Sequence, residues 1–433
     1  MHTQSAAAEV AADLRDWTGA QMPSLLDLYR RFHTNPELSL AEKETSASLA
    51  KELTDAGAKV TTGVGGYGIV GVMENGEGQT LLIRTDMDAL PVAEQTGLPF
   101  ASTVRSKDEQ GATVGVMHAC GHDLHMTNLV GVARYLNTHR DKWGGTIVFI
   151  GQPAEEIGSG AKAMLDDGLL VRFPRPGFAI ALHDAADMPT GQIGYRPGFC
   201  QANVDSVDIL VKGRGGHGAY PDTTIDPIVI AARLVLDLQT IVSRETKPTE
   251  PAVITVGSIH GGTKHNVIPD DCKLQLTVRS YSPQVREQLL DAIRRKATAA
   301  AASSGAPEPE VRVSQGTPAL YNDPELTAKV AAALKRAIGV ASVVESEPTM
   351  GGEDFSQFGL AGVPICMFRL GAVNQDRLDK FAADHKSPPS LHSPLFYPDA
   401  KEALSVGIPA MVAIATDLLP PQTTISTKPP AKE

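Results

Sequence analysis

Residues 117–126, MHACGHDLHM, bring one cysteine, three histidines and one aspartate into ten positions. The whole chain of 433 residues has only 4 cysteines and 12 histidines, so this segment concentrates scarce side chains. Thiol, imidazole and carboxylate groups are common ligands of transition metals, and a cysteine close to histidines is also the pairing that thiol nucleophiles use. The segment therefore indicates either a metal site or a nucleophilic cysteine.

Three predicted strands lead into further acidic or imidazole side chains. In open α/β sheets ligands bind beyond the carboxyl ends of the strands, so residues far apart in sequence are expected to meet at one edge. The segment 117–123 precedes a predicted helix, which places Cys120, His122 and Asp123 near the positive end of that helix. The strands are TLLIR, followed by Asp86 and Asp88; TIVFI, followed by Glu155 and Glu156; and FAIAL, followed by His183.

Taken one at a time, these residues also have structural explanations. A histidine at a strand end is often satisfied within the fold, adjacent glutamates often form a solvated patch, and Asp86 and Asp88 could cap loops by accepting backbone hydrogen bonds. We interpret His118 and His125 as bystanders. The convergence of the whole set favours a metal site over these separate explanations.

The elements that must position these residues are typical of the α/β class. Short apolar strands alternate with helical segments up to about residue 183, which predicts a sheet covered by helices on both faces. From about residue 204 the pattern changes to strands with one polar face. The order 205–212, 226–243, 252–259, 272–280, 283–302 and 310–313 reads strand, helix, strand, strand, helix, strand, which is the ferredoxin-like (βαββαβ) unit.

We therefore predict two domains. A discontinuous larger domain comprises residues 1–203 and 318–433, and the ferredoxin-like domain, residues 204–317, is inserted into it. The length of the chain also favours two hydrophobic cores. The C-terminal segment PPQTTISTKPPAKE is predicted to be disordered.

Composition limits the classes of partner. The net charge is −11, and neither a basic block nor a basic helix is present in the sequence, so nucleic acid and membrane surfaces are not expected partners. The longest apolar stretch, from Asp226, is interrupted by Arg233 and Asp237, which indicates an amphipathic helix. The N-terminal sequence lacks a cationic start and an apolar core, which predicts a cytoplasmic protein; a periplasmic one is the alternative if a signal peptide was removed.

Six motifs occur in an order that resembles a known family of dinuclear metallohydrolases, the aminoacylase/carboxypeptidase type. The similarity covers about residues 24–415 and is greatest to the branch of hippurate hydrolases, N-acyl-amino-acid deacylases and auxin-conjugate hydrolases. The motifs are RRFHTNPELSLAEKET, DMDALP, MHACGHD, PAEE, GRGGHGAYP and HNVIPD.

The resemblance implies a metal-ligand set and the catalytic residues. Glu155 is implied as the general base and Asp88 as the residue that orients the metal centre. Many relatives have a histidine ligand two residues before that aspartate; here the position is Asp86, which we leave out of the ligand set. The implied ligands are Cys120, His122, Glu156, His183 and His392.

Two divalent ions per subunit are implied, with Zn first and Mn, Co or Ni as alternatives. Such ions activate a bridging water and polarise the scissile carbonyl, while Glu155 moves the proton. The expected substrate is a small N-acyl (acetyl, benzoyl or indoleacetyl) amino acid. His217, Asn266 and Arg279 are implied to bind it, His217 as an oxyanion donor and Arg279 through a carboxylate. A homodimer through the inserted dimerisation or lid domain is also implied.

Three alternatives remain. Cys120 could be the nucleophile of a thiol hydrolase, which would leave the two glutamates and His183 without a role. The protein could be a dipeptidase or carboxypeptidase of the same family. It could also be a metal-binding interaction protein without catalysis, although Glu155 is present.

Overall fold

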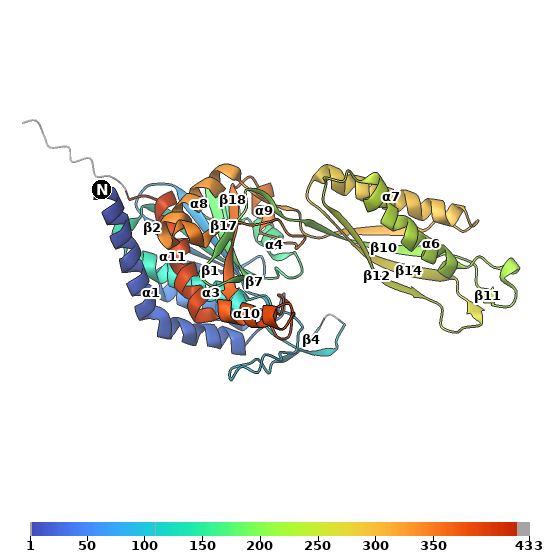
Figure 1. Cartoon of the computed structure of the whole chain (residues 1–433), viewed down its shortest axis with the longest axis horizontal. Helices are drawn as coiled ribbons and strands as arrows, with labels where there is room; N and C mark the ends of the chain where they lie inside the picture. Colours follow the sequence, from blue (N-terminus) through green and yellow to red (C-terminus); the bar gives the residue numbers. More distant parts are fainter. Residues whose placement is uncertain (1, 109, 422–433) are drawn as a thin grey trace, which may run out of the picture. The chain divides into compact units, whose positions relative to one another are not determined.

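The computed structural model of the protein describes residues 2–108 and 110–421 (Figure 1). Most of the C-terminal segment predicted to be disordered, residues 422–433, lies outside them. The chain forms two compact units: unit 1 contains residues up to Gly198, Tyr321–Glu347 and the chain from Gln357, and unit 2 contains Phe199–Leu320 and Pro348–Ser356. Among the described residues, no helix is both long and apolar enough to span a bilayer.

Unit 1 is built on an eight-stranded mixed sheet. Four neighbouring strands, β6, β3, β7 and β18, run parallel, and the strands beyond them include antiparallel pairs. In order across the sheet the strands are β1 (Lys59–Val64), β2 (Gly68–Asn75), β6 (Gly145–Gln152), β3 (Thr80–Asp86), β7 (Phe178–Pro189), β18 (Ile365–Val373), β8 (Ile193–Tyr195) and β17 (Val343–Glu345).

Both faces of this sheet are covered. Every residue of β3 from Leu81 to Asp86 is buried, although successive side chains point to opposite faces. Helices α1, α3 and α11 pack against one another, and α3 packs on β3. This confirms the predicted α/β class. The helices are α1 (His2–Thr34), α2 (Lys43–Asp55), α3 (His122–Thr138), α4 (Gly160–Asp166), α5 (Leu169–Arg172), α8 (Pro324–Ile338), α9 (Ser356–Leu360), α10 (Gln375–Ala383) and α11 (Ala400–Leu418).

Short elements complete unit 1 and its connections. The hairpin β4–β5 lies between β3 and α3 in sequence, and β9 and β16 lie where the chain passes from one unit to the other. Their bounds are β4 (Arg105–Lys107), β5 (Thr113–Gly115), β9 (Gly198–Gln201), β16 (Leu320–Asn322), η1 (Arg140–Lys142) and η4 (Val340–Ser342).

Unit 2 is the predicted βαββαβ domain. Its four strands are all antiparallel in the order β12-β14-β10-β15, and Figure 1 shows α6 and α7 on the same side of this sheet. Buried and exposed residues alternate along β14, because one face packs on the helices and the other is polar. The elements are β10 (Asn203–Lys212), β11 (Gly216–His217), η2 (Pro221–Thr223), α6 (Pro227–Thr240), the short π-helix η3 (Ile241–Glu245), β12 (Ala252–Gly261), β13 (Val267–Ile268), β14 (Asp271–Ser280), α7 (Pro283–Ala302) and β15 (Glu310–Gln315).

Each of the two helices α6 and α7 of unit 2 begins with a capping side chain followed by a proline. Asp226 accepts hydrogen bonds from the backbone N–H groups of Ile228 and Val229, and Pro227 fills the first helical position. Ser282 caps α7 in the same way, ahead of Pro283. A capping oxygen satisfies a backbone donor that has no partner inside the helix, and proline has no such donor to satisfy.

Candidate metal centre

The chemistry-bearing residues of unit 1 meet at the carboxyl ends of the parallel strands. Asp86 ends β3 and pairs in register with Gln152, the last residue of β6. Arg84 pairs with Ala181 on β7, which places His183, two residues later, level with Asp86. The prediction that the strand ends before His183 is wrong, because β7 continues to Pro189 and pairs with β18 over that length. The strand pairing places His183 at the predicted edge all the same.

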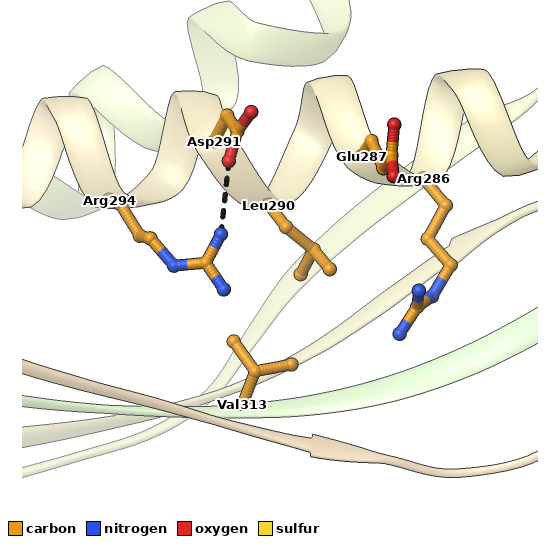
Figure 2. A pocket seen from close by; sticks show the side chains of 6 residues that line it. All are labelled: Arg286, Glu287, Leu290, Asp291, Arg294 and Val313. Carbon is orange, nitrogen blue, oxygen red and sulfur yellow. Dashed lines mark hydrogen bonds and ion pairs between the residues drawn. The ribbon is translucent and has the colours of Figure 1, made fainter.

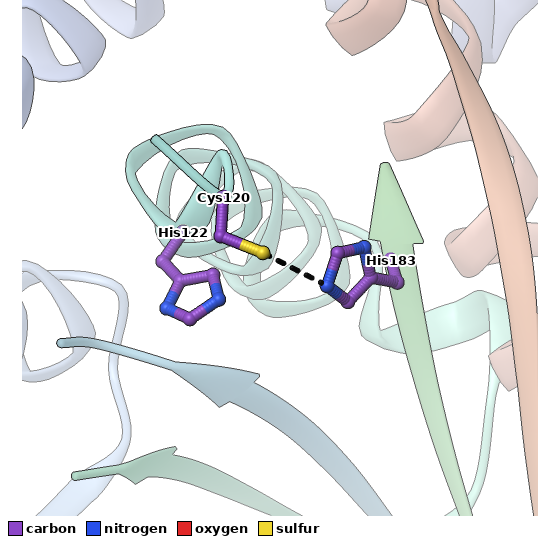
Figure 3. A group of neighbouring side chains, drawn as sticks. All are labelled: Cys120, His122 and His183. Carbon is purple, nitrogen blue, oxygen red and sulfur yellow. Dashed lines mark hydrogen bonds between the residues drawn. The ribbon is translucent and has the colours of Figure 1, made fainter. Parts of the chain in front are cut away.

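Cys120 and His122 come from a tight turn into α3. Gly121 between them has a φ of 74°, and a Cβ atom there would lie 2.3 Å from Oδ2 of Asp184. Glycine is therefore required twice, once for the left-handed backbone and once for the space. The turn directs the sulfur of Cys120 towards His183, which comes from β7, and the ring of His122 lies beside Cys120 (Figure 3).

Cys120 belongs to two groups of potential ligands. With His122 and His183 it forms one group, and with Glu156 and His392 it forms the other; within each group one ligand atom per residue lies within 4.8 Å of the others. The Cys120 Sγ atom is 3.6 Å from His183 Nε2 and 3.3 Å from His392 Nε2. His392 Nε2 is in turn 3.5 Å from Glu156 Oε2. The structure thus brings together all five residues implied as ligands, around one shared sulfur.

The hydrogen bonds of His122 and His183 leave their Nε2 atoms available. Nδ1 of His122 donates to the backbone oxygen of Asp88, and Nδ1 of His183 donates to that of Asp184, both at 2.8 Å. A neutral imidazole that donates through Nδ1 has its lone pair on Nε2, which is how metal-binding histidines are oriented. His122 Nε2 and Glu156 Oε1 are buried without a hydrogen-bond partner. These donor atoms fit a divalent cation.

The electrostatics of the cluster favour positive charge. Burial raises the pKa of the Cys120 thiol well above its ordinary value, and nearby carboxylates add to the effect. Burial also raises the pKa of Glu156. Burial alone would lower the pKa of His122, but the carboxylates of Asp86, Asp88 and Glu156 outweigh it and raise the pKa to about 10. A bound cation relieves these costs, because it neutralises carboxylates and lets a thiol ionise.

Asp88 and Glu155 lie in the same cluster. Asp88 Oδ2 accepts hydrogen bonds from the backbone N–H of Glu156 at 3.0 Å and from Ser39 Oγ at 2.6 Å. The Glu155 side chain is buried, and it has a carboxylate oxygen within 4.8 Å of ligand atoms of His122 and Glu156. Asp88 and Glu155 thus both lie among the potential ligands.

Asp86 has other partners. Its Oδ2 accepts from Arg84 Nη1 and its Oδ1 from His125 Nδ1, both at 2.7 Å, while His122 Nε2 is 3.6 Å away. Two short hydrogen bonds from cationic or polarised donors occupy this carboxylate, which supports leaving it out of the ligand set. His125, which we interpreted as a bystander, lies buried between Asp86 and Asp184, and the backbone N–H of Asp184 donates to its Nε2 at 2.9 Å. His118 is buried, and neither of its ring nitrogens has a hydrogen-bond partner.

Sequence reasoning assigned no role to His33 and Glu42. His33 Nδ1 is 2.6 Å from Asp123 Oδ2, next to His122, and His33 Nε2 is 3.1 Å from Glu94 Oε1. Glu42 accepts a hydrogen bond from the backbone N–H of Ala154, one residue before Glu155. Both lie in the motif RRFHTNPELSLAEKET, whose similarity to relatives was the available signal.

In unit 2, His217 and Asn266 lie side by side. β11 pairs with β13 so that His217 faces Val267, and the backbone N–H of Gly218 donates to the backbone oxygen of Asn266. His217 is exposed, and its Nδ1 accepts from Ala219 N at 3.0 Å, so the proton is on Nε2 and is available to a ligand.

Within unit 2, Arg279 does not lie near His217 and Asn266. It lies eight residues along β14 from Asp271, which is about 26 Å at the usual rise of a strand. Its Nη1 donates to the backbone oxygen of Met350 at 2.5 Å. Arg279 is thus at the end of unit 2 where the chain connects to unit 1, and His217 is at the other end.

A cavity of about 500 Å³ lies on unit 2 between α7 and β15 (Figure 2). Its arginines are already paired: Arg286 makes two hydrogen bonds of 2.7 Å with Asp205, and Arg294 makes one of 3.0 Å with Asp291. The cavity therefore has no concentration of uncompensated charge comparable with the cluster in unit 1.

Comparisons with known proteins agree with this cluster. Residues 82–389 match the family described as peptidase family M20/M25/M40. The chain is 38% identical over 370 residues to thermostable carboxypeptidase 2 of Saccharolobus solfataricus, covering 84% of this chain and 88% of that protein. It is 36% identical over 340 residues to N-acetylcysteine deacetylase of Bacillus subtilis, covering 77% and 84%. A crystal structure of a Bacillus subtilis protein, described as a dinuclear metal binding peptidase of this family, superposes with a TM-score of 0.76 at 30% identity, covering 93% and 100%.

Proposed function

Because the chain belongs to peptidase family M20/M25/M40 and is a metal-dependent hydrolase of that family, we propose that it cleaves the amide bond of N-acyl amino acids. The products would be a carboxylic acid and a free amino acid. The observation that carries the proposal is the shared position of Cys120 between two ligand groups, with Glu155 close to His122 and Glu156 in the same cluster. The similarity to N-acetylcysteine deacetylase supports an acylated amino acid as the substrate class.

Five residues would hold two divalent ions. Cys120, His122 and His183 would form one site, and Cys120, Glu156 and His392 the other, with Zn first and Mn, Co or Ni as alternatives. The bound ions supply positive charge that acidifies water and polarises the amide carbonyl. Asp88 would orient the centre, because it fixes the ring of His122 through its carbonyl and the backbone of Glu156 through its carboxylate.

Glu155 would move the proton. Its carboxylate accepts a proton from the attacking water and then donates it to the nitrogen of the departing amine, general base first and general acid second. The position of Glu155 supports this role, since one of its carboxylate oxygens lies within 4.8 Å of ligand atoms of His122 and Glu156. The negative oxygen of the tetrahedral intermediate would be stabilised by donors, and the Nε2–H of His217 is suited to this.

We propose that the protein acts as a homodimer through the inserted domain, residues 204–317. The edge strand β12 and the exposed side chains of Val229 and Leu236 on α6 are suited to two-fold association. One substrate could not contact Arg279 and His217 of the same unit 2, because Arg279 lies about 26 Å along β14 from Asp271, at the end of the domain that carries His217. We therefore infer that Arg279 and Asn266 bind substrate from different subunits, with Asn266 beside His217.

Chelation and reconstitution test the proposal. Protein freed of metal with a chelator should lose hydrolysis of N-acetyl, N-benzoyl or indoleacetyl amino acids and regain it with Zn²⁺ or Mn²⁺. Full activity in protein that elemental analysis shows to be metal-free would overturn it, and would point to Cys120 as a nucleophile.

A dipeptidase or carboxypeptidase is the second candidate, favoured by the 38% identity to a thermostable carboxypeptidase. The two candidate activities are distinguished by assaying pairs of substrates that differ only in whether the N-terminal amino group is free or acylated. Faster turnover of dipeptides with a free amino group than of their N-acetylated or N-benzoylated counterparts would select the peptidase.

A further inference from the structure

Glu42 is a buried carboxylate beside the metal centre that the proposed mechanism does not use. Its side chain is fully buried at the start of α2. Oε1 accepts a hydrogen bond of 2.7 Å from the backbone N–H of Ala154, 112 residues away in sequence, and Oε2 has no hydrogen-bond partner. Burying a carboxylate with one unsatisfied oxygen opposes folding, so a contribution to stability does not explain why a glutamate occupies this position.

The residue that Glu42 holds has a strained backbone. Ala154 has a φ of 51°, in the left-handed region that residues with a Cβ atom rarely adopt. Its carbonyl oxygen accepts hydrogen bonds from the backbone N–H groups of Ser159 and Gly160, so the turn is held on that side too. A strained conformation of this kind persists only where the surrounding structure imposes it, and such positions cluster at functional sites.

Glu155 lies between two peptide groups that are each held by a carboxylate. Glu42 holds the N–H of Ala154, before Glu155, and Asp88 holds the N–H of Glu156, after it. The backbone of Glu155 is thus fixed on both sides by acceptors from distant parts of the chain. A proton-transfer group works only within a small range of positions, and misplacement of about 1 Å can cost about 10²-fold in rate.

We propose that Glu42 is a positioning residue for Glu155: its Oε1 keeps Ala154 in the left-handed conformation that directs the Glu155 carboxylate to the reacting atoms. The inference rests on the proposed role of Glu155 as general base. Burial raises the pKa of Glu42 to about 7, so both protonation states are populated near neutral pH. Either state leaves a lone pair on Oε1 for the Ala154 N–H, because the proton can reside on Oε2.

A purely structural role for Glu42 predicts a different outcome. A structural residue loses stability and activity together when it is removed. Removal of a positioning residue whose second oxygen is unsatisfied should lower kcat and leave KM and metal content unchanged. The midpoint of thermal unfolding should stay the same or rise.

Four variants of metal-reconstituted full-length protein test the proposal, with a matched control. Glu42→Ala should lower kcat by ~10–100-fold, whereas Glu42→Gln should retain most of it because the amide oxygen still accepts from Ala154. Ala154→Gly should remain within ~3-fold of the wild type. Adding it to Glu42→Ala should restore kcat by ~3–10-fold, because glycine adopts positive φ without a holding group.

Glu52→Ala is the control on the same helix. Glu52 is nearly buried and pairs with Arg31 and with Arg134, which are not part of the metal centre, so its loss should lower the thermal midpoint and leave kcat unchanged. The positioning role is overturned if Glu42→Ala keeps kcat within ~3-fold of the wild type, or if it lowers the midpoint as Glu52→Ala does and the glycine restores nothing. Glu155→Gln is measured in parallel. An unaffected rate in that variant overturns the assignment of the general base itself, and a lost rate beside an unaffected Glu42→Ala overturns the positioning role alone.

Discussion

Asp88 and Glu156 are joined by a hydrogen bond of 3.0 Å from the backbone N–H of Glu156 to Oδ2 of Asp88. Through its backbone oxygen the same aspartate accepts from Nδ1 of His122. One residue therefore touches both groups of ligands, His122 through its main chain and Glu156 through its side chain. Substitution of Asp88 keeps the first of these hydrogen bonds and removes the second, together with the charge of Oδ1, which lies 3.5 Å from His122 Nδ1.

Asp88→Ala should thus weaken metal binding unequally. His122 keeps its orientation, but Glu156 loses the acceptor that fixes its backbone, and loss of such a partner costs ~10–100-fold in affinity. Titration of the metal-free variant with buffered Zn²⁺ should show one binding event close to that of the wild type and one weaker. Ser39→Ala, which removes only the second hydrogen bond to Oδ2, is the control. Equal weakening of both events would contradict this division.

The two adjacent glutamates should respond differently to the same substitution. Glu155→Gln should keep its metal and lose ~10²–10⁴-fold in kcat, the range for a general acid–base group. Glu156→Gln should lose metal as well, because an amide is a poor ligand in place of a carboxylate. Metal content and kcat measured on the same preparations check this. Equal metal content in both variants, with Glu155→Gln at the wild-type rate, would mean that the roles are wrongly assigned.

His217 should act in the active site of the partner subunit. His217→Ala should lower kcat by ~10²–10³-fold, as loss of one oxyanion donor does, with metal content unchanged. Mixing His217→Ala with Glu155→Gln subunits under conditions of exchange should restore activity, because one of the two hybrid sites keeps both groups. If the subunits exchange and no activity returns, His217 acts in its own chain or has no catalytic role.

His33 should make stability depend on pH. Burial lowers its pKa, but the hydrogen bonds with Asp123 and Glu94 outweigh this and raise the pKa to about 10. Because the folded pKa exceeds the unfolded value, ~6.5, the stabilisation is complete below about pH 6.5 and is lost as pH rises towards 10. It should be on the order of a few kcal/mol. The difference in thermal midpoint between the wild type and His33→Gln should shrink from pH 6 to pH 10; a difference that stays constant would contradict it.

The sequence predicted the parts of the fold that have a local signal. The strands TLLIR and TIVFI and the βαββαβ order are visible as apolar runs and alternation, because burial on one face or two dictates those patterns. The end of β7 was missed because its last residues, Asp184–Pro189, mix polar and small side chains. That part of the strand is maintained by pairing with β18, a partner about 180 residues away that no local pattern reveals.

In the candidate site, too, the residues with a local sequence signal were predicted and those that depend on distant contacts were not. Cys120, His122, Glu156, His183 and His392 were inferred from motifs, and the fold brings them together. Glu42 and His33 were not assigned roles, since both act through hydrogen bonds or ion pairs to residues between 61 and 112 positions away. Such contacts depend on how α1 and α2 pack against the sheet, which side-chain type and spacing do not encode.

The ligands of the two groups belong to parts of the fold that differ in how easily they open. His183 lies inside β7, hydrogen-bonded between β3 and β18, whereas His392 has a φ of 67° in a segment without regular structure, and its side chain is about half exposed. Local opening, seen as fast amide hydrogen exchange, should therefore reach the loop of His392 long before the strand of His183. Two ions bound at these places would then differ in residence time. Competing chelators should remove one quickly, leaving a form of the enzyme with a single ion that can be isolated and loaded with a second, different metal.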